Sequence, residues 1–394
     1  MTKKTVLLIL CTWFLGNLDI HFFSPALPQI AEFFSVKSNT AQLTMSIFLL
    51  GKALSMLLWG ILSERYGRKP IFSFGLVLYL ITNALAAFSP SITLLLLCRF
   101  FQGLAVGATL LMGRAMINDC HNEQKATQYF AWLFTFAGVF ICFLSFCGGL
   151  INSQWNWQVA SLIIAAYALM LVPLSFGLKE TQRTYYNDFS FKNTVITVFQ
   201  HPLFIGYLGI SALMMAGESA FNTSASFILI KGEQWTTTQY GGAKTTMAIM
   251  HLLGSACCGF LIKHYSSRQL TAFGVYFFAC SSVLMGIFNL CSDSILLTFI
   301  LPMAIYYFGT GFIVASACSV VVRPFPKQMA LALALTLFCQ FSCSALFSFI
   351  SSVADIKEPS SFMRLLGVLS IFSLITLNHL RINEQKVCTT KLMG

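Results

Sequence analysis

The chain has 394 residues, of which 57% are hydrophobic and only 9% charged, and its formal net charge is +11. Soluble domains carry about 25% charged residues, so this chain has too few of them to cover a surface that faces water. The composition therefore excludes a soluble protein and indicates an integral membrane protein. Its excess of Lys and Arg is better explained by topology in the lipid bilayer than by binding of nucleic acid.

Twelve apolar segments are long enough to cross a bilayer, which takes about 20 residues each. In chain order they fall near residues 5–23, 41–62, 71–88, 92–112, 129–150, 158–178, 203–230, 243–262, 270–290, 295–317, 328–353 and 362–380. We therefore predict an all-α integral membrane fold with twelve transmembrane helices.

The basic residues between these segments are distributed unevenly. The connections after even-numbered spans and the segment after the last span hold most of them, whereas the odd-numbered connections hold only Lys37, Lys231 and Lys357. Because basic loops stay in the cytoplasm, we expect a multi-pass protein of the bacterial inner membrane with both termini cytoplasmic. The polar segment 179–202 predicts a cytoplasmic linker between two six-helix bundles, 1–178 and 203–394.

The two halves are related in sequence. The string GILSERYGRKPI at 60–71 recurs in weaker form as GFLIKHYSSRQL at 259–270, which is an offset of 199 residues. The same offset places Asp19 opposite Glu218 and Lys52 opposite His251. Transporters are commonly built from such repeats, with the substrate site at the interface between them.

The loop between the second and third predicted spans resembles a motif of the major facilitator superfamily, G-x-L-[SA]-[DE]-R-x-G-R-[KR], at every defined position. Its residues here are Gly60, Glu64, Arg65, Gly67, Arg68 and Lys69. We expect Gly60 to permit close helix approach, Gly67 to permit a turn with positive φ, and the charged residues to form a cluster that latches one conformation. The resemblance implies two six-helix bundles around a central cavity.

The fourth span strengthens this resemblance. Arg99, Gln102, Gly103 and Gly107 share one face of a helix and are similar to the superfamily's R-x-x-Q-G pattern, in which the arginine lies near the coupling machinery. The string RAMIND, which ends at Asp119, resembles the bicyclomycin-resistance (Bcr/CflA) branch of drug:proton antiporters. We therefore add Asp119 to the latch.

Other short strings resemble the same branch, but with departures. SPALP at 24–28 matches it, yet the branch has Asp where this chain has His21, and the acid here is Asp19. These two positions lie about 200° apart on a helix, so they face different sides. SFCGG at 145–149 lacks the prolines of the exporters' fifth-helix motif, which weakens the inference of antiport.

Carboxylates within the spans are the main candidates for proton coupling, because desolvation favours their protonated form. Asp19 and Glu218 are these candidates, and static pairing is the alternative. Asp19 would then pair with Lys52 or Arg99, and Glu218 with His251 or Lys244. The imidazoles of His21 and His251 can titrate near pH 6.5 and, with Arg99, complete the candidate coupling residues.

Basic and aromatic side chains within the spans are candidates for substrate binding. Lys52 and Lys244 would favour an anionic substrate, while Trp132, Tyr306 and Tyr307 could line the cavity with their rings.

No nucleotide-binding loop, metal-ligand cluster or nucleophile elbow is present, so we expect neither an enzyme nor a cofactor other than the proton gradient. The sequence predicts a monomeric, proton-coupled transporter that exports small amphipathic compounds, either drugs or a metabolite such as a siderophore. The alternatives are an uptake carrier for an anionic metabolite and a membrane receptor that does not transport.

Overall fold

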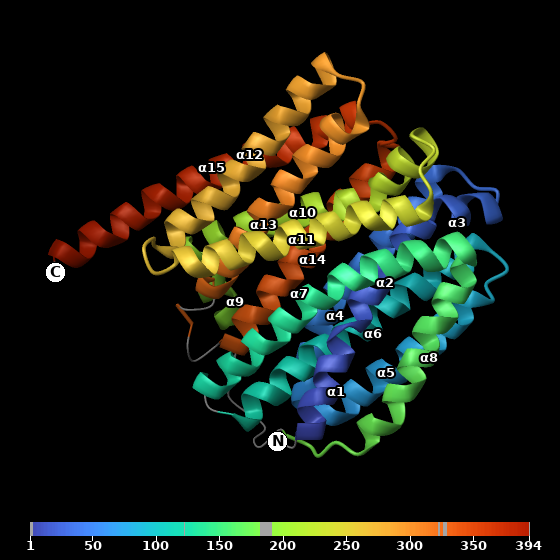
Figure 1. Ribbon diagram of the computed structural model, residues 1–394. Helices are drawn as coiled ribbons and strands as arrows, with labels where there is room; N and C mark the ends of the chain where they lie inside the picture. Colours follow the sequence, from blue (N-terminus) through green and yellow to red (C-terminus); the bar gives the residue numbers. More distant parts are fainter. Residues whose placement is uncertain (1–2, 122, 182–190, 322–323, 326–328, 394) are drawn as a thin grey trace. The chain divides into compact units, whose positions relative to one another are not determined.

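The computed structural model describes residues 3–121, 123–181, 191–321, 324–325 and 329–393, and all regular secondary structure in these residues is helical (Figure 1). Eleven helical segments among them are long and apolar enough to cross a membrane. Helices suit these sequences because each backbone polar group in lipid must find its partner within the segment. A twelfth span is α11 (Thr237–Leu261), which is 25 residues long but carries several Thr and Gly residues and Lys244. The predicted membrane fold is thus confirmed.

The chain forms two compact units. The first contains Met1–Phe189, Ala220–Thr245 and Ala345–Asp355, and the second contains Ser190–Ser219, Thr246–Ser344 and Ile356–Gly394.

In the first unit, α4 packs on α6, α5 packs both on its neighbour α6 and on α8, and α2 packs on α7. The bounds are α1 Lys3–Trp13, α2 Leu15–Phe23, α3 Leu27–Phe33, α4 Ser38–Tyr66, α5 Arg68–Ala87, α6 Ile92–Cys120, α7 Glu123–Gln154 and α8 Trp157–Phe176. The first span was expected to end near residue 23, and this boundary is wrong, since helical structure continues to Phe33. Pro25 and Pro28 occupy first turns, where a missing N–H removes no hydrogen bond.

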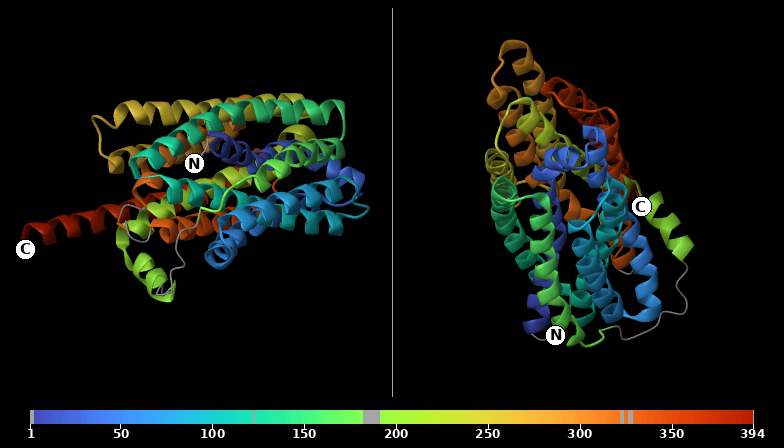
Figure 2. Two further views of the ribbon diagram at one scale, coloured as in Figure 1. Left: turned by 90° about the horizontal axis from the view of Figure 1, so that it is seen from below. Right: turned by 90° about the vertical axis from the view of Figure 1, so that its right-hand side faces the viewer.

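In the second unit, α12 packs on both α13 and α15. The bounds of its helices, some of which extend into the first unit, are α9 Phe191–Gln200, α10 Pro202–Ser226, α12 Ser267–Cys291, α13 Leu301–Val320, α14 Met329–Val353 and α15 Pro359–Met393. The helix α9 falls within the segment predicted as a linker, and Figure 2 shows it at an angle to α10.

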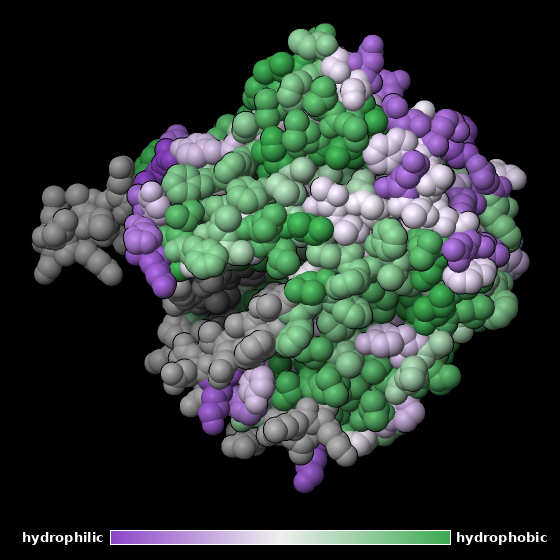
Figure 3. Space-filling model, viewed as in Figure 1, coloured by the Kyte–Doolittle hydropathy of each residue, from purple (hydrophilic) through white to green (hydrophobic). Residues whose placement is uncertain are grey.

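Glycines set the close packing of α4 on α6. A Cβ added to Gly51 would meet the carbonyl of Phe100, and one added to Gly103 would meet the carbonyl of Phe48. Gly60 was expected to serve close approach too, and this reason is wrong, because a Cβ there would lie an ordinary 3.8 Å from Leu111. Outside these contacts the helices expose apolar residues, which cover most of the face in Figure 3.

Candidate functional site

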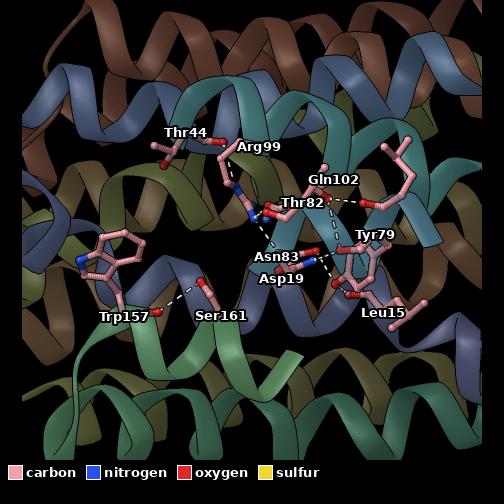
Figure 4. Close-up of polar contacts among 11 residues, drawn as sticks. Leu15, Asp19, Thr44, Tyr79, Thr82, Asn83, Arg99, Gln102, Trp157 and Ser161 are labelled. Carbon is pink, nitrogen blue, oxygen red and sulfur yellow. Dashed lines mark hydrogen bonds and ion pairs between the residues drawn. The ribbon is translucent and has the colours of Figure 1, made fainter. Parts of the chain in front are cut away.

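The centre of the first unit holds a fully buried ion pair between α2 and α6. Nη1 of Arg99 donates to Oδ1 of Asp19 over 2.7 Å, and both side chains are 0% exposed (Figure 4). The hydroxyl of Tyr79, from α5, donates to Oδ2 of the same carboxylate over 2.5 Å. Three helices thus meet at one carboxyl group.

The guanidinium of Arg99 is held on several sides. Nη1 also donates to Oε1 of Gln102 over 2.6 Å, and Nε donates to the carbonyl of Thr44 over 3.4 Å. The group lies over the rings of Phe23 and Phe48, at 4.0 and 4.4 Å from their centroids. Among the described residues, Nη2 has no hydrogen-bond acceptor. Asp19 therefore supplies the counter-charge of Arg99, and protonation of the Asp19 carboxylate would remove that counter-charge.

The sequence left Lys52 and Arg99 as possible partners of Asp19, and the ion pair in the structure is with Arg99. The sequence reasoning missed Tyr79 altogether. This tyrosine is the only polar aromatic residue of the third predicted span, but nothing in an apolar run shows which way such a side chain points.

His21 lies on a different side of α2 from Asp19, as the helical spacing predicts. Its Nδ1 lies 2.8 Å from Oγ of Ser145 in α7, and Lys244 of α11 is within electrostatic range. A Cβ on Gly148 would meet the backbone carbonyl of His21. Gly148 therefore lets α7 pack directly on α2.

The remaining coupling candidates lie in the second unit. Nδ1 of His251 lies 2.7 Å from Oγ1 of Thr310, whereas the sequence suggested a pair with Glu218. Glu218 is half-buried on α10, and the hydroxyl of Tyr306 comes close to its backbone.

The aromatic candidates are mostly packing residues. Tyr306 is fully buried, and its hydroxyl donates to the carbonyl of Met214. Its ring lies 5.5 Å from that of Tyr307, which is also buried. These contacts favour helix packing over the cavity lining expected for Tyr306. The side chain of Trp132 lies outside the described residues. No group of three or more His, Cys, Asp or Glu side chains in the described part of the chain could hold a metal ion.

The loop motif forms a charge cluster around Arg68, at the start of α5. This side chain donates to Oγ of Ser63 over 2.5 Å and lies 3.5 Å from Asp119 and 3.7 Å from Glu64. Arg65 instead is exposed and lies over the ring of Tyr66. The predicted cluster therefore centres on Arg68 without Arg65.

A residue that the sequence reasoning missed completes this cluster. The carboxylate of Glu180 accepts hydrogen bonds from the backbone N–H groups of Arg68 and Lys69, over 3.0 and 3.1 Å. It therefore caps the N-terminus of α5, where a negative charge is stabilised by the helix dipole. Gly67 precedes the cap with φ of 93°, and a Cβ there would lie 2.5 Å from the Glu180 carboxylate. The only signal in the sequence was an acid directly after the sixth span.

A second set of interhelical contacts in the first unit involves residues that precede α4 in the chain. Glu32, at the end of α3, forms an ion pair with Lys231. Oγ of Ser24 donates to the carbonyl of Asn222 over 2.7 Å and lies 2.6 Å from the hydroxyl of Tyr240.

Hydroxyl groups continue this set of contacts. Ser348 of α14 bonds both Ser46 of α4, over 2.8 Å, and Thr223 of α10, over 2.7 Å. Replacing such a hydroxyl–hydroxyl hydrogen bond by hydrogen bonds to water costs little free energy, because the net contribution of one hydrogen bond to stability is only about 1 kcal/mol. We call the contacts of Glu32, Ser24, Ser46 and their partners the hydroxyl end.

Known proteins resemble this chain over most of its length. The family model of the Major Facilitator Superfamily matches residues 8–376. An uncharacterized transporter of Rickettsia felis is 25% identical over 390 residues, covering 95% of this chain and 96% of that protein. The multidrug resistance protein MdtL of Shewanella oneidensis is 24% identical over 377 residues, covering 91% and 90%. The multidrug resistance protein D of Escherichia coli is 23% identical over 319 residues, covering 79% of each.

Solved structures agree on the fold. The crystal structure of a D-xylose-proton symporter matches with a TM-score of 0.74 at 13% identity, covering 94% of this chain and 96% of that one. A nucleoside transporter matches with a TM-score of 0.72 at 13% identity, covering 96% and 99%. The chain therefore belongs to the major facilitator superfamily, whose members are membrane transporters and not enzymes.

Proposed function

We propose that this protein is a proton-coupled secondary transporter that exports small amphipathic compounds by alternating access. The observation that carries the proposal is the carboxylate of Asp19, buried at the meeting point of α2, α5 and α6 and paired with Arg99. The printed names of the multidrug resistance relatives support export of drugs. Export of an endogenous metabolite such as a siderophore is the other form of this proposal.

The coupling step follows from the charge on Asp19. The ionised carboxylate attracts Arg99 and accepts the Tyr79 hydroxyl, which holds three helices together. Protonation replaces an ion pair by a neutral acid and leaves a buried guanidinium without its counter-charge, so the packed arrangement loses stability relative to an alternative one. The proton gradient is the only energy source this step requires.

The proposal includes a topology. Two six-helix halves, 1–178 and 203–394, are joined by a cytoplasmic linker at 179–202, and both termini lie in the cytoplasm of a bacterial cell. The basic residues of the 60–70 loop support this orientation. The cluster around Arg68 is then cytoplasmic, and the hydroxyl end is periplasmic. We further propose that one chain acts alone.

Proton movement in proteoliposomes tests the function. Under an imposed pH gradient, lipophilic cations and then polycarboxylates are added, and internal pH is followed with the Asp19→Asn protein as control. Substrate-triggered proton flux that the control lacks supports the proposal. If neither the lipophilic cations nor the polycarboxylates trigger proton flux, the proposal is overturned in favour of a receptor on the same fold. Substrate that moves in the same direction as the protons would indicate uptake instead.

A further inference from the structure

The hydroxyl group of Tyr79 faces two acceptors on α2. Its oxygen lies 2.5 Å from Oδ2 of Asp19 and 2.9 Å from the backbone carbonyl oxygen of Leu15 (Figure 4). Both acceptors are on one face of α2, because residues four apart lie one above the other on a helix. A phenol has a single hydrogen and donates it to only one of them at a time. The Tyr79 hydroxyl therefore has two alternative hydrogen bonds, which differ by rotation about its C–O bond.

The charge on Asp19 decides between these two bonds. An ionised carboxylate only accepts, and a hydrogen bond to it is about twice as strong as one to a neutral oxygen, so the phenol donates to Oδ2 while Asp19 is ionised. A protonated Oδ2 is itself a donor. The Tyr79 hydroxyl then accepts from Oδ2 and turns its own hydrogen to the carbonyl of Leu15.

The neighbours of Asp19 favour a proton on Oδ2 over one on Oδ1. The ionisable side chains that act on Asp19 come from three other helices: Arg99 from α6, Tyr79 from α5 and Lys52 from α4. Oδ1 accepts from Nη1 of Arg99 over 2.7 Å, and a proton there would compete with that bond, because a guanidinium has donors and no acceptor. An ammonium group has no acceptor either. Asp19 and Tyr79 are both fully buried, so an O–H group without an acceptor would cost free energy, and the Tyr79 oxygen supplies the acceptor at Oδ2.

We propose that Tyr79 is a positioning residue for proton uptake by Asp19, whose hydroxyl donates to the ionised carboxylate and accepts from the protonated acid. One proton enters at Oδ2, the phenol keeps its own hydrogen, and Tyr79 stays neutral throughout. The inference rests on the proposed proton coupling and adds the residue that keeps both charge states of Asp19 hydrogen-bonded. A buried carboxyl group with a partner in each state can alternate between the two.

Infrared difference spectroscopy of the purified protein in lipid nanodiscs tests this role without a gradient or a substrate. The C=O stretch of protonated Asp19, identified by its loss in Asp19→Asn, reports the titration of the carboxyl group. Tyr79→Phe keeps the ring and should raise the titration midpoint by about 0.5–1 pH unit, a three- to tenfold change in proton affinity, because the ionised acid loses the stronger hydrogen bond. The matched control is Tyr167→Phe, which removes a hydroxyl that donates to the carbonyl of Cys11 and should leave the midpoint unchanged.

A second substitution should act in the opposite direction. The amino acid 3-fluorotyrosine in place of Tyr79 keeps the hydroxyl and makes it a stronger donor, so it should lower the midpoint. In the wild-type protein, the C–O stretch of Tyr79 should also shift as Asp19 titrates, because the hydroxyl changes its acceptor and gains a donor.

Two results would overturn the positioning role. A midpoint that neither substitution moves would reduce Tyr79 to a packing contact with Leu15, and a C–O stretch that ignores the titration would mean that the hydroxyl never turns. If no Asp19 band appears at any pH at which the protein is folded, the coupling proposal fails as well, whereas a titrating Asp19 with an unmoved midpoint refutes this inference alone.

Discussion

Glu32 and Lys231, which form an ion pair, are separated by 199 residues, the same offset that relates the two halves of the sequence. The pair therefore joins two positions that the sequence repeat predicts to be equivalent, and it belongs to the hydroxyl end of the first unit.

Neighbouring contacts follow the same relation. The offset maps Ser46 of α4 onto Thr245 of α11, and Gly149 of α7 onto Ser348 of α14. Ser46 bonds Ser348, while Gly149 packs closely against α11 at Gly241. The α4–α14 and α7–α11 contacts are thus counterparts, and they use hydroxyl groups and glycines in place of large apolar side chains. Such a surface separates and becomes hydrated at low cost, which alternating access requires.

Cross-linking the ion-paired positions should stop transport. In a Glu32→Cys/Lys231→Cys protein, a short bifunctional thiol reagent should reduce substrate flux to background, because the proposed alternating-access cycle opens the hydroxyl end once per turnover. Reduction of a cleavable linker should restore the flux. Radiolabelled substrate uptake into proteoliposomes measures both steps.

The control for cross-linking is each single-cysteine variant treated with the same reagent. The ion pair itself is exposed and contributes only about 0.2–1 kcal/mol, so the untreated double variant should transport normally. Full transport by the cross-linked protein would show that this end stays closed throughout the cycle.

Neutralising Asp19 distinguishes a role in proton coupling from a role in a static ion pair with Arg99. Asp19→Asn should abolish gradient-driven transport and, by leaving Arg99 charged and unpaired, should destabilise the protein by about 3–5 kcal/mol. The double variant Asp19→Asn/Arg99→Gln should recover much of that stability, since no lone charge remains. Thermal unfolding in detergent measures the stability, and substrate counterflow without a gradient shows that the variant is folded.

The decisive comparison is gradient-driven transport by the double variant. If Asp19 carries the coupling proton, the double variant is stable and still inactive. Recovery of transport together with stability would mean that the pair only holds the helices together.

The spans were predictable from sequence because each is a long apolar run, and the shared helix face of Arg99 and Gln102 was predictable because the two are about one turn apart. Tyr79 and Glu180 were not, since they contact residues 60 and 112 positions away, respectively. Which residues meet across helices depends on helix rotation, and an evenly apolar span carries no periodicity from which rotation can be read. The predicted end of the first span was wrong for another reason. Pro25 and Pro28 fit the first turns of successive helical segments, so the helical structure continues past them.

Removing the cap on α5 should slow the transport cycle more than it weakens substrate binding. Glu180→Ala deletes the acceptor for two backbone N–H groups and a charge that the helix dipole stabilises, at a cost of about 0.5–2 kcal/mol. The maximal rate should fall while the half-saturating concentration stays within error. Lys179→Ala, one residue earlier, is the matched control, and a raised half-saturating concentration at an unchanged rate would count against a role in turnover.

The two glycines of the loop motif should respond to alanine with opposite signs. Gly67 has φ of 93° and ψ of 167°, a region that essentially only glycine adopts and where a side chain costs about 1–3 kcal/mol, and its Cβ would also press on the Glu180 carboxylate. Gly60 is helical, and its Cβ would have room beside Leu111. Alanine in a helix is favoured over glycine by about 0.5–1 kcal/mol. Thermal unfolding should therefore show Gly67→Ala to be destabilised and Gly60→Ala to be unchanged or stabilised, whereas destabilisation of both would mean that the motif needs close helix approach at Gly60 after all.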